Sequence, residues 1–295
     1  MELLGVLAAV LSSALGGTAI GATRYLSGTL DPVTMGAVRF GGGCGVLCLI
    51  AVLRGDRWPE EKDWLGAAGL GLLFFFLFPV LFNLSLRYTT SARGALSLST
   101  LPLLTMLAAG LLGIETPTPK KIIGVTTAMI GVAIALSTSM KDAPPTAWCG
   151  DILMFSAACC MALYTVWSRP YVARSGTITF TAFGMGMGSV CLIALSISNG
   201  GIVQLATLQP AQLFAAGYLA LIGGAAIFFL WAFAVSRTTP TLVAISVTVN
   251  PVTASLFGLV ILNESIEPSL ILGLLAVLAG IGIAYGGRKP RALHD

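Results

Sequence analysis

The chain contains one pattern twice: TTSARGALSLSTLPLLTMLAAGLLGIE (residues 89–115) and TTPTLVAISVTVNPVTASLFGLVILNE (residues 238–264), 149 positions apart. The match extends without a gap over Arg87–Ala135 and Ser236–Ala284. Each copy predicts a turn, an apolar helix with a central proline, a short acidic turn and a second apolar helix. An offset of half the chain indicates two homologous halves. Identical pairs fall at Thr89/Thr238, Thr90/Thr239, Ala95/Ala244, Ser97/Ser246, Pro102/Pro251, Leu107/Leu256, Glu115/Glu264, Pro119/Pro268, Ile122/Ile271, Gly124/Gly273, Gly131/Gly280, Ile134/Ile283 and Ala135/Ala284.

The composition is that of an integral membrane protein. Apolar residues make up 56% of the 295 residues, charged residues 9%, and the mean hydropathy is +0.93. A soluble domain of this length needs far more charge to cover its surface. The six cysteines lack zinc-site spacing and the only histidine is His294, so we expect no metal, no cofactor and no histidine-based active site. In a membrane protein, a net charge of +4 reflects the Lys and Arg that set the orientation of the helices in the lipid bilayer. We therefore expect no nucleic-acid partner.

Ten stretches are long and apolar enough to cross a bilayer as helices, which takes about 20 residues. They predict an all-α integral membrane fold with ten transmembrane helices, arranged as two inverted five-helix repeats around a central cavity. The first repeat is residues 1–140 (helices 1–5), and the second is residues 141–295 (helices 6–10 with a cytoplasmic tail). The predicted spans are residues 3–23, 32–53, 64–86, 90–112, 120–138, 149–168, 178–198, 211–235, 239–262 and 268–287.

Lys and Arg are divided unequally between the two sets of loops. The side that holds both termini has eleven, the other side has four, and Arg39 inside a span completes the sixteen. Because cytoplasmic loops carry the excess of positive charge, we expect both termini in the cytoplasm. Five helices per half is an odd number, so the second half enters the membrane from the opposite face. Inverted repeats of this kind are typical of transporters that work by alternating access.

The two prolines of the repeated helix, Pro102 and Pro251, are predicted to lie near mid-membrane. Proline removes a helix hydrogen bond, and the freed carbonyl is tolerated in lipid only where it is buried or lines a water-filled cavity. Passive kinks are common, but matching positions in two inverted halves favour a hinge or cavity role. Ser99, Thr248 and Asn250 lie close by and are predicted to supply polar groups to the cavity. The alternative is that the hydroxyls bond only to their own backbone.

Short turns precede both proline helices. We expect the turn at Tyr88–Ser91 on the outer face and the turn at Arg237–Pro240 on the inner face. Each turn makes a tight helical hairpin that could move as a gate, and Tyr88 and Arg237 are the predicted gate residues. Helix capping by the threonines is the other interpretation.

Aromatic residues gather on three other helices. Phe82 and Trp231 are equivalent at the 149-residue offset, Asn83 follows Phe82, and Tyr164 and Trp167 lie late in helix 6. We predict that these five residues line the cavity. The competing interpretation is an interfacial belt, in which Trp and Tyr mark the ends of spans.

Charges are nearly absent from the spans. Arg39 lies about two turns inside helix 2, which makes it a candidate for substrate contact or gating; the alternative is a structural anchor whose long side chain reaches toward water. No Asp or Glu lies in the middle of any predicted span. Proton-driven transporters usually carry such a group, so its absence favours a uniporter.

These features resemble the drug/metabolite transporter superfamily, EamA type, over the whole chain. The residues that carry the resemblance are Pro32 with Arg39-Phe40, the Ala95…Pro102 helix with the Glu115 turn, their copies Ala244…Pro251 and Asn263-Glu264, and Gly282–Ala284. Within the family the chain is most similar to bacterial amino acid exporters of the YddG type. The resemblance implies a basket-shaped fold whose cavity is lined by helices 1, 3, 4, 6, 8 and 9, which adds Thr18 of helix 1 to the cavity residues. It also implies export of aromatic and other neutral amino acids and similar small metabolites across the inner membrane. We expect the protein to act as a monomer.

Three rival functions remain at this stage. The nearest is efflux of drugs, nucleobases or other metabolites in the same fold. A membrane-embedded enzyme would need a clustered acid, histidine or metal site, which the sequence does not supply. A channel is disfavoured by inverted repeats with paired prolines. We therefore predict a transporter and no enzymatic activity.

Overall fold

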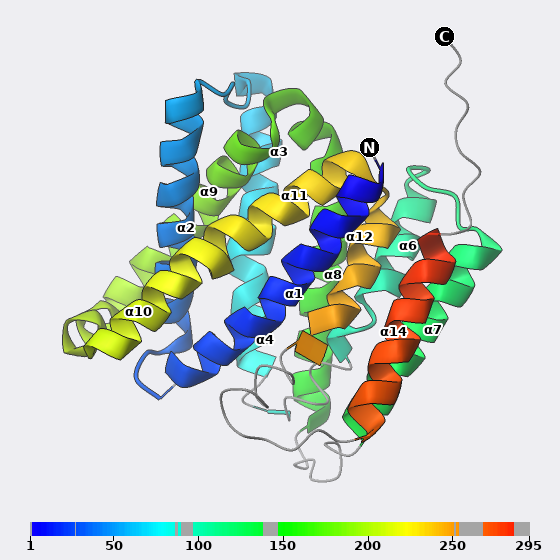
Figure 1. Ribbon diagram of the computed structural model, residues 1–295. Helices are drawn as coiled ribbons and strands as arrows, with labels where there is room; N and C mark the ends of the chain where they lie inside the picture. Colours follow the sequence, from blue (N-terminus) through cyan, green and yellow to red (C-terminus); the bar gives the residue numbers. More distant parts are fainter. Residues whose placement is uncertain are drawn as a thin grey trace.

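The computed structural model describes residues 2–26, 28–85, 88–89, 97–137, 147–250, 252–253 and 268–285. All regular secondary structure in these ranges is helical, which confirms the all-α class (Figure 1). The helices are α1 (Glu2–Leu26), α2 (Pro32–Arg54), α3 (Glu61–Leu72), η1 (Leu73–Leu77), α4 (Phe78–Ser85), α6 (Leu101–Leu111), α7 (Pro119–Leu136), α8 (Ala147–Ser175), α9 (Thr177–Ser198), η3 (Gly201–Thr207), α10 (Pro210–Tyr218), η4 (Leu219–Ala226), α11 (Ile227–Arg237), α12 (Pro240–Ser246), η5 (Val247–Val249) and α14 (Pro268–Tyr285).

The length and hydropathy of these helices confirm a multi-pass membrane protein. Within the described ranges, six helical stretches are long and apolar enough to cross a membrane, and shorter apolar helices accompany them. Large apolar side chains face outward, among them Leu65 at 88% and Leu111 at 89% exposure. Such a surface is stable where lipid is the solvent. The count of ten spans stays a prediction, because residues 90–96 and 254–262 lie outside the described ranges.

Two of the long helices change geometry at their centres. Glu61–Ser85 is continuous through α3, η1 and α4, and Pro210–Arg237 is continuous through α10, η4 and α11. Both central segments, η1 and η4, are π-helical. The 149-residue offset places η1 on residues 222–226, which fall inside η4. Single π turns inside α-helices are frequent at functional sites.

The first proline helix differs from the sequence prediction. Residues 90–112 were expected to form one helix with Pro102 at its centre, but α6 begins at Leu101 after a turn at Ser99–Thr100. Proline is accepted in the first turn of a helix, where its missing N–H has no helical partner to lose. In the second copy, α12 passes into the 3-10 turn η5, which ends at Val249. The equivalent proline, Pro251, lies outside the described residues. Both copies therefore leave α-helical geometry at equivalent positions.

Glycines hold the α7–α14 pair together. A Cβ atom added at Gly124 would lie 2.6 Å from the Gly280 carbonyl oxygen, and one at Gly131 would lie 2.8 Å from that of Gly273. Only small residues allow backbones to approach so closely. Figure 1 shows α7 and α14 side by side at one edge of the molecule, with α2, α3 and α9 at the other. The α7–α14 pair packs against α12, at the edge of the helices that position the candidate site.

Candidate functional site

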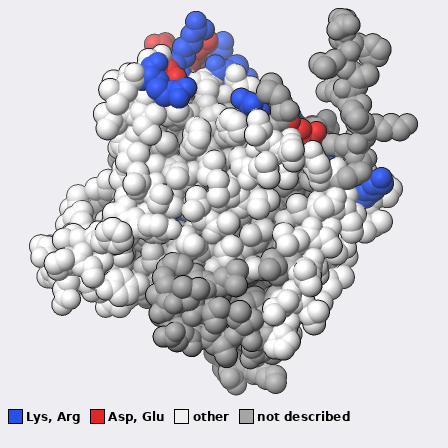
Figure 2. All heavy atoms as spheres, in the orientation of Figure 1, with Lys and Arg blue, Asp and Glu red and all other residues white. Residues whose placement is uncertain are grey.

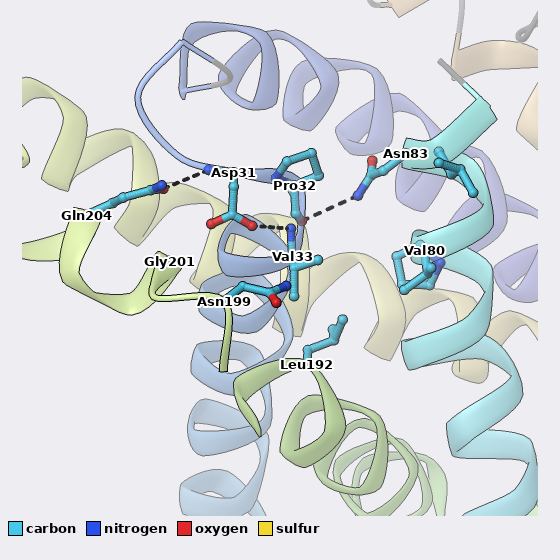
Figure 3. Close-up of a pocket in the computed structure, with 11 residues that line it drawn as sticks. Asp31, Pro32, Val33, Val80, Asn83, Leu192, Asn199, Gly201 and Gln204 are labelled. Atoms are coloured by element: carbon cyan, nitrogen blue, oxygen red, sulfur yellow. Dashed lines mark hydrogen bonds between the residues drawn. The ribbon is translucent and has the colours of Figure 1, made fainter. Parts of the chain in front are cut away.

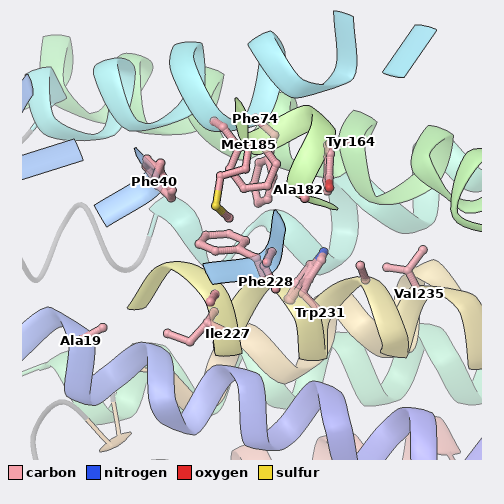
Figure 4. Close-up of a cluster of buried hydrophobic side chains, with 14 of the residues drawn as sticks. Ala19, Phe40, Phe74, Tyr164, Ala182, Met185, Ile227, Phe228, Trp231 and Val235 are labelled. Carbon is pink, nitrogen blue, oxygen red and sulfur yellow. The ribbon is translucent and has the colours of Figure 1, made fainter. Parts of the chain in front are cut away.

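Six aromatic side chains from four parts of the chain form a buried cluster, which we call the aromatic centre (Figure 4). Phe74 stacks on Tyr164 with ring centroids 4.1 Å apart, and Phe75 meets Phe228 edge-on at 5.1 Å. Offset and edge-to-face pairs of this kind stabilise an interior beyond their buried area. The members are Phe40 of α2, Phe74 and Phe75 of η1, Tyr164 of α8, and Phe228 and Trp231 of α11, each at most 9% exposed.

Trp231 brings an unsatisfied donor to this centre. The residue is 3% exposed, and its indole Nε1 has no hydrogen-bond partner in the structure. Figure 4 shows this nitrogen and the Tyr164 hydroxyl directed toward one another. A buried donor without a partner costs about 1–3 kcal/mol, so such a group in a native protein calls for an explanation. An acceptor atom of a bound ligand would provide one.

Arg39 closes one edge of the aromatic centre. Its Nε donates to the Gly223 carbonyl at 2.9 Å, and its guanidinium lies 5.4 Å from the Phe40 centroid and 5.7 Å from that of Phe228. Gly223 belongs to η4, and a Cβ atom there would lie 3.3 Å from Arg39 Nε. The side chain is thus held beside the aromatic rings by a backbone carbonyl and by cation–π contact. Its role in substrate contact stays a prediction.

A second polar group lies between α1 and the end of α12. The Ser13 and Ser246 hydroxyls are 2.9 Å apart, and Asn250 Oδ1 is buried without a hydrogen-bond partner. A Cβ atom at Gly16 would lie 3.1 Å from that oxygen, so the amide packs closely against the glycine. Asn250 and Trp231 thus share one property among the predicted cavity residues: each has a buried polar atom without a hydrogen-bond partner.

Other predicted hydroxyls have partners. Thr248 donates to the Ile245 carbonyl at 2.6 Å, as the alternative interpretation expected. The Thr18 and Tyr218 hydroxyls are 2.6 Å apart, which joins α1 to α10. Ser99 is buried at 4% exposure and is also partnered. Of these three, the Thr18 bond joins two helices, and a contact of any of them with substrate stays a prediction.

Asn83 lies away from the aromatic centre, beside a cavity of about 330 Å³ (Figure 3). Its Nδ2 donates to the Pro32 carbonyl at 3.4 Å. The cavity lies between the start of α2, the end of α4 and the segment after α9, and Asp31 and Gln204 add polar atoms to its wall. The Asp31 N–H donates to Gln204 Oε1 at 2.8 Å.

The remaining predicted residues are dispersed. Phe82 packs on Phe78 at 5.9 Å, and Trp167 is 42% exposed and does not join the aromatic centre. Tyr88 is exposed in the turn after α4, where its N–H donates to Ser85 at 2.9 Å. Arg237 ends α11 with its guanidinium 4.6 Å from the Phe233 centroid.

Four members of the centre were missed from the sequence. These members are Phe40, Phe74, Phe75 and Phe228. All four are apolar residues in apolar spans, so the sequence does not indicate whether their side chains face the interior or the lipid. The triplet Phe74–Phe76 was the available signal. The π turn that positions two of the three rings has no sequence signature of its own.

Comparison with known proteins agrees with this architecture. The profile of the EamA-like transporter family matches residues 3–137 and again residues 148–286. The chain is 24% identical over 274 residues to the uncharacterised transporter YyaM of Bacillus subtilis, covering 92% of this chain and 90% of that protein. It is 26% identical over 267 residues to the uncharacterised inner membrane transporter YedA of Escherichia coli, covering 88% and 85%. One crystal structure matches with a TM-score of 0.80 and 20% identity, over 96% of this chain and 98% of its own, so that likeness shows the fold alone.

The chain belongs to the EamA-like transporter family. It is a multi-pass membrane transporter and not an enzyme, as the sequence predicted.

Proposed function

We propose that this protein exports amino acids, aromatic and other neutral ones, and similar small metabolites across the inner membrane by alternating access. The proposed frame is ten helices in two inverted repeats, residues 1–140 and 141–295, with both termini in the cytoplasm. Support comes from the matched π segments η1 and η4 and from the matched helix breaks at Ser99–Thr100 and Val247–Val249. Figure 2 adds that Lys and Arg gather at the end of the molecule where α1 begins. The protein would act as a monomer, without a cofactor.

The unpartnered Nε1 of Trp231 is the observation that carries the substrate class. The indole N–H is a donor only, so its partner must be an acceptor. Arg39 adds a fixed positive charge at the edge of the same cluster, and the surrounding rings favour an apolar or aromatic side chain. A carboxylate next to an aromatic or aliphatic group satisfies all three conditions. Neutral amino acids have this chemistry.

The test is a substrate series in proteoliposomes that contain the purified protein. Labelled tryptophan should enter, and unlabelled tryptophan, phenylalanine and leucine should compete with it. Tryptamine, which lacks the carboxylate, and tryptophan methyl ester, which lacks its charge, should compete at least tenfold less well. Equal competition by all of these compounds would overturn the carboxylate assignment.

Efflux of nucleobases or drugs is the second candidate. In its favour, the two buried acids among the described residues, Asp63 and Glu115, already pair with Arg174 and Lys121, so neither is left to pair with an α-ammonium group. Uracil, adenine and a planar cationic dye belong in the same competition series. Transport of these compounds in place of every amino acid would select this candidate.

A further inference from the structure

Two threonine–carboxylate hydrogen bonds join distant parts of the chain. Thr89 Oγ1 donates to Asp151 Oδ1 at 3.0 Å, and Thr238 Oγ1 donates to Glu2 Oε1 at 3.4 Å. Both threonines are buried, at 6% and 2% exposure. Each lies just after the end of a long helical stretch, Glu61–Ser85 or Pro210–Arg237, and each acid lies in the first turns of α8 or α1.

The two bonds are copies of one another. The offset that relates Thr89 to Thr238 also relates Glu2 to Asp151. In each case a threonine of one half donates to an acid of the other half, so the two bonds are reciprocal. The pattern is the one expected when a pseudo-two-fold axis exchanges the halves.

Close backbone approach accompanies each bond. A Cβ atom at Gly150 would lie 2.6 Å from Thr89 Cβ and 2.7 Å from the Ser85 carbonyl oxygen. A Cβ atom at Gly5 would lie 2.8 Å from Arg237 Cβ and 3.3 Å from Thr238 Cβ. Both contacts are thus tightly packed seams with a buried threonine.

The seams lie at opposite ends of the molecule. In Figure 1 the start of α1 meets the end of α11 at the top, whereas α8 begins at the bottom, where α4 ends. A contact at each end between opposite halves is the place where a molecule that opens alternately to two sides must separate.

We propose that Thr89–Asp151 is the outer gate contact and Thr238–Glu2 the inner gate contact of the transport cycle. The inference rests on the proposed alternating access and names the atoms that hold each gate. In this structure both contacts are made at once. Breaking one would release one end of the molecule while the other end stays joined. Because a hydrogen bond to a charged group shifts a two-state equilibrium by roughly tenfold or more, loss of either hydroxyl should bias the facing of the transporter.

The experiment measures thiol labelling from each side in a cysteine-free background. The reporters are Ser85→Cys and Ala234→Cys, repeat-equivalent positions that are both 0% exposed beneath the two gate contacts. Thr89→Val keeps the shape and removes the hydroxyl, and should raise outer labelling at position 85 several-fold without raising inner labelling at position 234. Thr238→Val should do the reverse. Thr127→Val is the matched control, because that exposed hydroxyl bonds to the Ile123 carbonyl of its own helix; it should change neither.

Serine variants and acid variants keep the test decisive if a valine variant fails to fold. Thr89→Ser and Thr238→Ser retain the donor and should label as the parent does, whereas Asp151→Asn and Glu2→Gln weaken the acceptor and should follow the valine pattern. Unchanged labelling in the valine and acid variants, or a rise at both reporters together, would overturn the inference. Labelling needs no substrate, so a reciprocal result stands even if amino acids are not transported.

Discussion

Glu115 accepts two hydrogen bonds from Thr241, one from its backbone N–H at 3.2 Å and one from its hydroxyl at 3.0 Å. Glu115 follows α6, and Thr241 lies in the first turn of α12, so a carboxylate of one half caps a helix of the other half. Lys121 forms an ion pair with the same carboxylate, and the side chains of Lys121 and Glu115 are 7% and 3% exposed. At the 149-residue offset, Thr241 and Lys121 correspond to Ala92 and Leu270. Ala92 has no hydroxyl and Leu270 has no charge, so the hydroxyl bond and the ion pair have no counterpart in the second set.

Breaking this buried pair should destabilise the protein. Glu115→Ala leaves an unpaired buried ammonium and Lys121→Ala an unpaired carboxylate, and loss of one partner of a buried pair costs about 3–5 kcal/mol. The double variant Glu115→Gln/Lys121→Met removes both charges but keeps an acceptor for Thr241, and should recover much of the loss. Thermal or denaturant unfolding in detergent measures the stability of the two single variants and the double variant against the parent. Single variants as stable as the parent would contradict the assignment.

Removal of the Trp231 N–H should separate stability from transport. Trp231→Phe eliminates a buried donor whose lack of a partner costs about 1–3 kcal/mol, so we expect unchanged or higher stability together with at least tenfold slower amino acid transport. Trp64→Phe is the matched control. Its Nε1 donates to the Pro59 carbonyl at 2.9 Å and its side chain is exposed, so transport should persist. Full transport by Trp231→Phe would remove Trp231 from the substrate site.

The helix breaks before the two prolines should be needed for movement. Pro102→Ala restores a backbone donor and lets helix continue from Leu98 into α6, which stiffens the segment. We expect slower transport and altered outer labelling at Ser85→Cys, and for Pro251→Ala slower transport and altered inner labelling. Pro119→Ala is the control, because the extended Thr118 precedes Pro119, so no preceding helix could continue through that position. Parent-like behaviour of both variants would make the breaks passive.

The sequence predicted some of these features and missed others for physical reasons. The spans at residues 32–53 and 178–198 nearly coincide with α2 (Pro32–Arg54) and α9 (Thr177–Ser198), because Pro, Arg and Asn end the apolar runs sharply. Tyr164 and Trp231 were named together, and the structure brings them into one cluster. The π turns and the capping of α12 by Glu115 depend on tertiary packing, which periodicity does not encode. The same holds for the threonine–carboxylate bonds, whose partners lie 62 and 236 positions apart in the chain.

The coupling prediction follows from the absence of a carboxylate near mid-membrane in any predicted span. A uniporter equilibrates its substrate, so an imposed pH gradient should leave the final level of amino acid in proteoliposomes unchanged. The measurement compares that level with and without the gradient, with an ionophore as the control. Accumulation above equilibrium in the direction set by the gradient would show proton coupling.

Counterflow tests the central claim most directly. Proteoliposomes loaded with excess unlabelled tryptophan are diluted into a trace of labelled tryptophan, with no ion or pH gradient. An alternating-access carrier returns from each outward step with labelled substrate, so the internal label should rise above its equilibrium level and then decay. The overshoot should be absent in tryptophan-loaded liposomes without protein, and strongly reduced in proteoliposomes that contain Trp231→Phe. A rise that only approaches equilibrium would indicate a channel, and no entry of any amino acid would contradict the proposed substrate class.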